Sequence, residues 1–111
     1  MTECTYLRRA REVFEIEIEG LQEVCSGLGT DFVRLVDVCL KILAGNGKLV
    51  LTGVGKSGHI ARKIAATLAS TGAPAVFMHP VEAIHGDLGM LSERDLLMAF
   101  SYSGETDELL T

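Results

Sequence analysis

The 111-residue sequence predicts an α/β fold, in which a parallel sheet is sandwiched by helices. Three short apolar runs carry this prediction, because each has the length of a strand buried in a parallel sheet. A helical segment joins the first two runs, so together they form a strand–helix–strand unit. Two more helical segments precede the first run and form an N-terminal helical pair. The strands are expected at 48–52, 75–78 and 96–101, and the joining helix at 57–70.

The first helix is expected from Thr5 to Leu28, because apolar residues recur along it every seven positions. A stripe with this spacing lies on one face of a helix and needs a second surface to cover it. We therefore expect the stripe to pack on another helix, either the next one as an antiparallel pair or a helix of a partner subunit. The stripe consists of Leu7, Phe14, Leu21 and Leu28.

The second helix is expected to begin with Thr30 or Asp31 as its N-cap. Short polar side chains suit this position because they accept hydrogen bonds from the first free N–H groups of a helix. Gly45 or Gly47 is expected to end it, since glycine readily adopts the left-handed conformation that closes helices. The second helix is therefore expected to begin after a polar N-cap and to end at a glycine.

The chain is long enough for one domain, with a helical lead-in over residues 1–46 and a sheet portion over residues 47–111. Three strands followed by the start of a helix leave one sheet edge and one sheet face uncovered. We therefore interpret the chain as the N-terminal part of a larger α/β domain, truncated after about three strands. A complete small three-stranded domain is the alternative.

Charge and composition exclude several classes of partner. Ten Lys and Arg residues stand against 15 Asp and Glu residues, so the net charge is −5 and no broad basic surface is available for nucleic acid. No segment has the length and hydropathy of a membrane span or a signal peptide, which predicts a cytoplasmic protein with no membrane partner. The three cysteines share no C-x-x-C spacing, so neither a disulfide nor a zinc knuckle is expected.

A glycine-rich turn, Gly53 to His59, follows the first strand and matches G-x-G-x-x-G. Such a turn lets backbone N–H groups approach an anion at a helix N-terminus. Val50 stands where a Walker A loop needs glycine, which disfavours a P-loop ATPase or GTPase. No acid ends the second strand to hold a ribose, so a dinucleotide-binding domain is only the weaker alternative. Lys56 opposes the helix dipole by about 0.3–1 kcal/mol unless an anion lies between them. A solvated surface lysine is the other interpretation.

Hydroxyl groups follow the third strand, from Ser101 to Thr106, again at the expected start of a helix. Hydroxyls and free amides suit a phosphate or a sugar. Ser103 also fits a plain N-cap, and Glu108 also fits the first turn of any helix, so a structural role stays open for both.

The segment between the second and third strands, from His79 to Gly89, holds two histidines and two acids. Such a density of titratable groups is typical of functional sites. Its candidate metal ligands have i, i+3, i+6 spacing, which drifts round a helix, and no fourth ligand stands nearby, so a required metal is disfavoured. These candidates are His79, Glu82 and His85.

Three segments together, GVGKSGHIARKIAATLASTG, HPVEAIHGDLGML and SYSGETDEL, resemble the sugar isomerase (SIS) domain of the arabinose-5-phosphate isomerase family, also called the KpsF/GutQ family. The resemblance runs from about Glu12 to the end of the chain. It implies a five-stranded parallel α/β sandwich that interconverts D-ribulose 5-phosphate and D-arabinose 5-phosphate for Kdo and lipopolysaccharide synthesis. It also implies a phosphosugar substrate, no cofactor, and a homo-oligomer, which is a tetramer in full-length relatives.

Residue by residue, the resemblance implies catalytic roles for Lys56, His85 and Glu108. It implies substrate contacts by Gly55, Ser57, Gly72, Ala73, His85, Ser101, Ser103 and Thr106. It implies that His79 binds zinc only as an inhibitor. Because each catalytic candidate follows a strand or its crossover, we expect the three to lie together at the carboxyl ends of the strands.

An aldose–ketose isomerisation through an enediol needs a base, a group that stabilises the oxyanion, and a group that opens the sugar ring. Glu108 is the candidate base, Lys56 the stabilising cation and His85 the ring-opening group, and the last two roles are exchangeable. The family's further strands, a further catalytic histidine and the paired CBS domains are absent from this sequence. An SIS module that senses a phosphosugar without catalysis therefore remains the alternative function.

Overall fold

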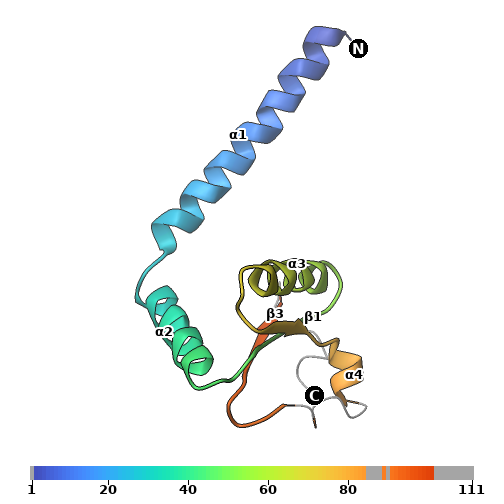
Figure 1. The fold of residues 1–111 in the computed structure, drawn as a ribbon. Coiled ribbons are helices and arrows are strands. Elements are labelled where there is room, and N and C mark those ends of the chain that lie inside the picture. Colours follow the sequence, from blue (N-terminus) through green and yellow to red (C-terminus); the bar gives the residue numbers. More distant parts are fainter. Residues whose placement is uncertain (1, 85–88, 90, 102–111) are drawn as a thin grey trace. The chain divides into compact units, whose positions relative to one another are not determined.

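The computed structural model describes residues 2–84, 89 and 91–101 (Figure 1). The chain divides into two compact units, residues 1–35 and residues 36–111. Helix α1 spans Glu3–Gly27 and helix α2 spans Thr30–Ala44, so the predicted N-terminal helical pair is present. Helix α1 begins two residues earlier than expected because the Thr2 hydroxyl accepts a hydrogen bond from the Thr5 N–H at 3.3 Å and caps the helix. No helix within the described residues is long and apolar enough to cross a membrane.

The apolar stripe of α1 is exposed, and the helix contains no buried residue. The expectation that this stripe packs on another helix, of this chain or of a partner subunit, stays a prediction. The exposed fractions are 51% for Leu7, 67% for Phe14, 70% for Leu21 and 56% for Leu28.

The ends of α2 differ by a residue or two from the prediction. The carbonyl of Gly29, not a side chain of the next two residues, accepts the first hydrogen bonds, from the N–H groups of Phe32 and Val33. At the other end Asn46 adopts the left-handed conformation with a φ of 64°, and the Gly47 N–H donates to the Ile42 carbonyl at 2.9 Å. Gly47 is needed for a different reason, because a Cβ there would lie 1.9 Å from the Arg94 carbonyl oxygen.

The second unit contains a three-stranded parallel sheet, as the sequence predicted (Figure 1). Strand β1 (Leu49–Gly53) lies between β2 (Ala75–Phe77) and β3 (Leu96–Phe100). Helix α3 (Lys56–Ser70) connects β1 to β2, and the short helix α4 (Pro80–Ile84) follows β2. The expected strand boundaries are therefore correct to within one residue.

The core lies between β1 and α3. Leu49 and Leu51 of β1 pack against Ala61 and Ala65 of α3, and all four are almost fully buried. The alanines leave little side chain between helix and sheet, so α3 approaches the strand closely. Partly buried side chains surround this cluster, contributed by α2, α3 and the two outer strands: Cys39, Ile42, Leu43, Ile64, Leu68, Ala75, Phe77, Leu96, Met98 and Phe100.

The opposite face of the sheet is covered only along its centre. Val50 is fully buried, but its register partners Val76 and Leu97 on the outer strands are 44% and 45% exposed. The outer strands therefore alternate between half-buried and exposed residues, whereas every residue of β1 is buried. Within the described residues this face is therefore covered along β1 and about half exposed along the outer strands, and the prediction of an uncovered face stays a prediction.

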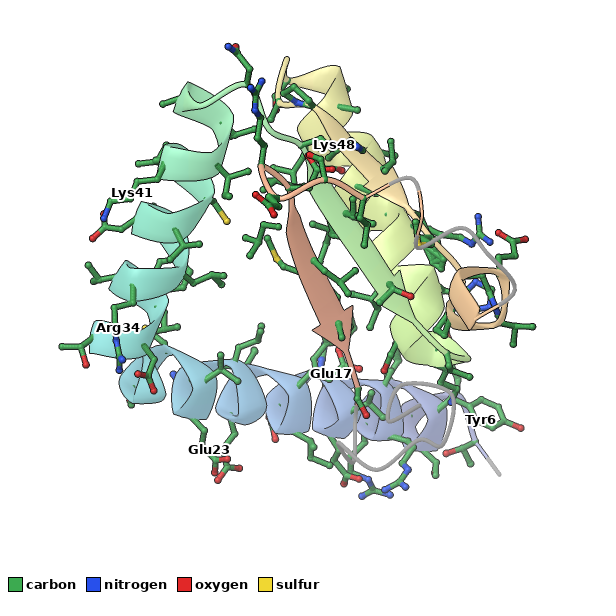
Figure 2. The ribbon with its side chains drawn as sticks, turned by 90° about the horizontal axis from the view of Figure 1, so that it is seen from below. Tyr6, Glu17, Glu23, Arg34, Lys41 and Lys48 are labelled. Carbon is green, nitrogen blue, oxygen red and sulfur yellow. The ribbon has the colours of Figure 1, made fainter. Side chains whose placement is uncertain are left out.

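A carboxylate that the sequence analysis did not select joins the amino ends of β1 and β3. The Asp95 side chain is 5% exposed and accepts hydrogen bonds from the N–H groups of Lys48, at 3.0 Å, and Ser92, at 3.0 Å. The Lys48 ammonium lies 2.7 Å from the same carboxylate (Figure 2). The Lys48 side chain and these backbone hydrogen bonds hold the pKa of Asp95 well below its usual range.

Candidate functional site

The glycine turn at the carboxyl end of β1 allows α3 to start directly against the strand. A Cβ on Gly58 would lie 2.6 Å from the Gly53 carbonyl oxygen, and a Cβ on Gly53 would lie 2.9 Å from the Ser57 carbonyl. Both contacts are with backbone, which cannot move aside without shifting the helix. The first and last glycines of the motif are therefore required by the packing of the first turn of α3 on β1.

The middle glycine has a different role. Gly55 adopts a φ of 61° with open space around it, a conformation that a residue with a side chain rarely takes. It is the N-cap of α3, and no side chain within the described residues caps that helix. The helical ladder begins where the Gly58 and His59 N–H groups donate to the carbonyls of Val54 and Gly55. The N-terminus of α3 is thus formed by backbone alone, an arrangement that suits an anion.

A cavity of about 180 Å³ opens beside this turn, between the start of α3 and the end of β2. Two glycine-turn residues, Gly53 and Gly55, form part of its wall. The rest of the lining is Gly58, His59, Arg62, Phe77 and His79. One of these side chains, Arg62, is positively charged and two are histidines, so the cavity combines a cation and imidazole nitrogens with a helix N-terminus that no side chain caps.

Aromatic contacts position Arg62 and His79. The Arg62 guanidinium carbon lies 4.1 Å from the centroid of the Phe77 ring, and the Phe77 and His79 ring centroids are 6.5 Å apart. The sequence analysis selected neither Arg62 nor His59. Their i, i+3 spacing on α3 places both on one helix face, but the approach of Phe77 from the next strand could not be foreseen from that spacing.

His79 has one ring nitrogen already engaged. Its Nδ1 accepts a hydrogen bond from the Val81 N–H at 3.1 Å, which leaves Nε2 as the atom that could donate a proton or bind a metal. Within the described residues no group of three or more His, Cys, Asp or Glu residues could hold a metal ion. The inhibitory zinc at His79 stays a prediction, and Nε2 is the ligand atom that it requires.

The structure brings several predicted site residues to one edge of the sheet. Lys56 is the exposed first residue of α3, and the half-buried Ser57 follows it. Ser101 directly follows β3, whose last residue, Phe100, is in register with Gly53 of β1. Because the strands are parallel, this residue comes from the same carboxyl edge as the glycine turn. Ser101, the first residue of the predicted third loop, therefore lies at the same edge of the sheet as the glycine turn.

Gly72 and Ala73 lie elsewhere. They follow the C-terminus of α3 and precede β2, whereas Lys56 begins the same helix. A 15-residue helix is about 22 Å long, so these two residues lie at the opposite end of the sheet from the glycine turn. This chain does not bring them into the cavity beside Lys56.

The remaining predicted residues lie outside the described part of the chain. They include the candidate base and the candidate ring-opening group, so the expectation that the three catalytic candidates share one side of the sheet stays a prediction. These residues are His85, Ser103, Thr106 and Glu108.

Residues 42–111 match the model of the SIS domain family. The chain is 50% identical over 103 residues to arabinose 5-phosphate isomerase GutQ of Escherichia coli K12, which covers 93% of this chain and 31% of that protein. It is 44% identical over 106 residues to arabinose 5-phosphate isomerase KdsD of Pseudomonas aeruginosa, covering 96% of this chain and 32% of the relative. The chain thus spans about a third of the length of these curated relatives.

A solved protein of E. coli CFT073, in complex with arabinose 5-phosphate, superposes with a TM-score of 0.89 and 42% sequence identity. The match covers 99% of this chain and 57% of that one. The resemblance of the three sequence segments to the arabinose-5-phosphate isomerase family is therefore confirmed, together with the parallel α/β fold that it implied. By its match over residues 42–111, the chain belongs to the SIS domain family.

Proposed function

We propose that this chain contributes the phosphosugar site of an isomerase that interconverts D-arabinose 5-phosphate and D-ribulose 5-phosphate. Two curated relatives carry the name arabinose 5-phosphate isomerase, and a solved relative holds arabinose 5-phosphate. D-arabinose 5-phosphate made by this reaction would supply Kdo and lipopolysaccharide synthesis, as the sequence resemblance implies. Because the chain spans only about a third of the named relatives, the complete reaction is assigned to a protein of their full length and not to this module alone.

One structural observation carries the proposal: a helix N-terminus that no described side chain caps opens beside a cavity lined by Arg62 and two histidines. Lys56 starts that helix, where its charge opposes the helix dipole unless an anion is bound. Arg62 adds a second positive charge from the cavity wall, and His59 and His79 add ring nitrogens. A phosphate or a sugar oxyanion would satisfy both the backbone amides and these cations.

The proposed chemistry moves one proton between C1 and C2 of the open-chain sugar and a second proton between the oxygens on these two carbons. We assign Glu108 as the base that removes and returns this proton through an enediol, and Lys56 as the cation that stabilises the oxygen on which negative charge develops. His85 polarises the ring oxygen or a hydroxyl during ring opening. Neither a redox cofactor nor a metal is needed, because the electrons of the transferred C–H bond stay within the sugar.

The proposal includes a homo-oligomer. Gly72 and Ala73 lie at the far end of α3 from Lys56. If they contact the same substrate as Lys56, they must come from a second copy of the chain. A substrate site shared between copies would make activity depend on assembly.

The first test is binding to the 111-residue chain. Amide NMR with D-arabinose 5-phosphate should perturb the glycine turn and Ser101, and Lys56→Gln should weaken binding by about tenfold or more, since a charge-assisted contact to a sugar oxygen is lost. Glu93→Gln, on the exposed segment before β3, is the matched control. A dinucleotide that perturbs the turn while the sugar phosphate does not would overturn the proposal.

The second test measures turnover in a chimera, in which residues 1–111 replace the matching segment of the E. coli GutQ relative. The proposal expects Glu108→Gln to lower kcat by about 10²–10⁴-fold with little change in sugar binding, because the amide keeps the shape of the side chain but cannot accept the proton. Lys56→Gln should lower kcat by about 10²–10³-fold. A chimera that binds the sugar phosphate but never turns it over would favour the sensing module.

A further inference from the structure

His79 stands at the N-cap position of helix α4, where a histidine is an unusual residue. The helix begins at Pro80, and proline is favoured at the first position of a helix because an N–H there would be unpaired. The Nδ1 atom of His79 accepts a hydrogen bond from the N–H of Val81, the second residue of the helix, at 3.1 Å. Serine, threonine, asparagine and aspartate make the same hydrogen bond as N-caps. The imidazole of His79 therefore caps α4.

The chain that leads into α4 is anchored on both sides of His79. The Met78 N–H donates to the Leu51 carbonyl of β1 at 2.9 Å, and Met78 is 8% exposed. Pro80, on the other side, is also buried. The hydrogen bond from Val81 to the imidazole thus ties the first turn of α4 to a fixed point at the edge of the sheet.

The ring of His79 adds what an asparagine cap lacks, which is an aromatic surface. Phe77 and His79 lie two positions apart at the end of β2, and their ring centroids are 6.5 Å apart. The Arg62 guanidinium carbon lies 4.1 Å from the centroid of the Phe77 ring. All three side chains line the cavity beside the glycine turn. A series of contacts therefore runs from α3 through the end of β2 to the first turn of α4.

We propose that His79 is a positioning residue of the isomerase site: its Nδ1 holds the first turn of α4, and the Phe77–Arg62 contact holds its ring. A five-residue helix is too short to be stable by itself, so it depends on its cap and its packing. Ile84, the last residue of α4, directly precedes the candidate ring-opening group His85 in the sequence. The cap therefore acts on catalysis through the segment that carries His85. The effect on turnover rests on the proposed isomerase function, whereas the cap itself does not.

The two ring nitrogens of His79 distinguish this role from a direct contact with the substrate. Asparagine places its carboxamide oxygen close to the position of Nδ1, and it is a good N-cap. Glutamine is one methylene longer, so its carboxamide nitrogen reaches the position of Nε2 and can donate a hydrogen bond there. A capping role thus predicts that asparagine replaces His79 and glutamine does not. A substrate contact through Nε2 predicts the reverse.

NMR of the 111-residue chain tests the cap without any turnover. A nitrogen–nitrogen coupling across the hydrogen bond should join the Val81 amide to Nδ1 of His79. Solvent exchange of the Val81 amide proton should be slow in His79→Asn and faster in His79→Gln. Absence of the coupling, or equal exchange in these two variants, would overturn the cap.

The same exchange measurement tests the contact of Arg62 with the Phe77 ring. Arg62→Gln removes the cation from the ring, so exchange of the Val81 amide proton should become about two- to fivefold faster. Lys63→Gln is the matched control, because it removes a neighbouring exposed charge of α3 that does not line the cavity. Equal exchange rates in Arg62→Gln and Lys63→Gln would overturn the part assigned to Arg62.

Turnover in the chimera with E. coli GutQ tests the consequence for catalysis. His79→Asn should keep kcat within about threefold of the unchanged chimera, whereas His79→Gln and His79→Ala should lower kcat by about tenfold, because the N-cap is lost. A glutamine variant as active as the asparagine variant would overturn the positioning role. An unchanged chimera without activity would contradict the proposed function itself, and the coupling between Val81 and His79 then still decides the cap.

Discussion

Helix α1 and strand β1 are both rich in apolar residues, but they differ in how far their side chains are buried. Every residue of β1 is buried, and Val50 and Leu51 have no exposed surface at all. No residue of α1 is buried, and Leu21 is 70% exposed. An apolar pattern therefore shows that a segment needs a covering surface, but not where that surface comes from. For β1 it comes from α3 and the flanking strands, and for α1 it must come from outside the helix.

The largest expected effect is a core truncation in β1. Leu51→Ala should lower the free energy of unfolding by about 2–5 kcal/mol, because it removes buried methyl groups and leaves a cavity beside Ala61 and Ala65. Leu21→Ala in α1 should change it by about 0.5 kcal/mol or less in the monomer. Urea unfolding at a concentration where the chain is monomeric compares the two. Equal losses would show that α1 is covered within the chain.

Glycine substitutions test the same difference between the packed second unit and helix α1. Gly58→Ala should destabilise the protein by about 1–3 kcal/mol, since its Cβ would meet the Gly53 carbonyl oxygen at 2.6 Å. Gly20→Ala, inside α1 with open space around it, should stabilise the helix by about 0.5–1 kcal/mol. Thermal unfolding of both variants measures the difference. A Gly58→Ala protein as stable as the wild type would mean that α3 can move off β1 at little cost.

Acid should weaken the second unit through Asp95. Its pKa is lowered in the folded state, so its contribution to stability is complete above the ordinary value of 3.8 and is lost as the pH falls from there toward the lower folded pKa. Asp95→Asn should remove this pH dependence between about pH 4 and pH 2. The exposed Arg9–Glu12 pair of α1 should contribute little, so Glu12→Gln serves as the control in acid titrations followed by circular dichroism. An acid-unfolding profile of Asp95→Asn that equals the wild-type profile would show that the Lys48–Asp95 ion pair does not stabilise the second unit.

The smallest expected effect concerns a buried hydroxyl in β1. Thr52 is 6% exposed, and its Oγ1 has no hydrogen-bond partner within the described part of the chain. Thr52→Val keeps the shape and removes the unpaired polar atom, so it should stabilise the protein by about 1 kcal/mol. Thr67→Val, whose hydroxyl is exposed and donates to the Lys63 carbonyl, is the control and should not stabilise. Destabilisation by Thr52→Val would show that the hydroxyl is satisfied.

Much of the fold could be predicted from local patterns. A continuous apolar run can be buried only as a central strand, and strand β1 was expected within one residue of its observed bounds. Ile60, Ile64 and Leu68 recur at helical spacing and Gly72 follows them, so helix α3 is likewise specified without reference to any distant residue. The glycine turn was recognised for the same reason, because motif and spacing are properties of neighbouring residues.

Contacts between distant residues were beyond such patterns. The Lys48–Asp95 ion pair joins residues 47 positions apart, and the Arg62–Phe77 contact beside the cavity joins a helix to the following strand. The same holds for Gly47, whose neighbour is the Arg94 carbonyl oxygen. Periodicity states which face of an element is apolar and which residues begin and end it. The identity of the surface that meets that face depends on how the whole chain packs, and only the tertiary structure shows that α3 and the outer strands cover β1.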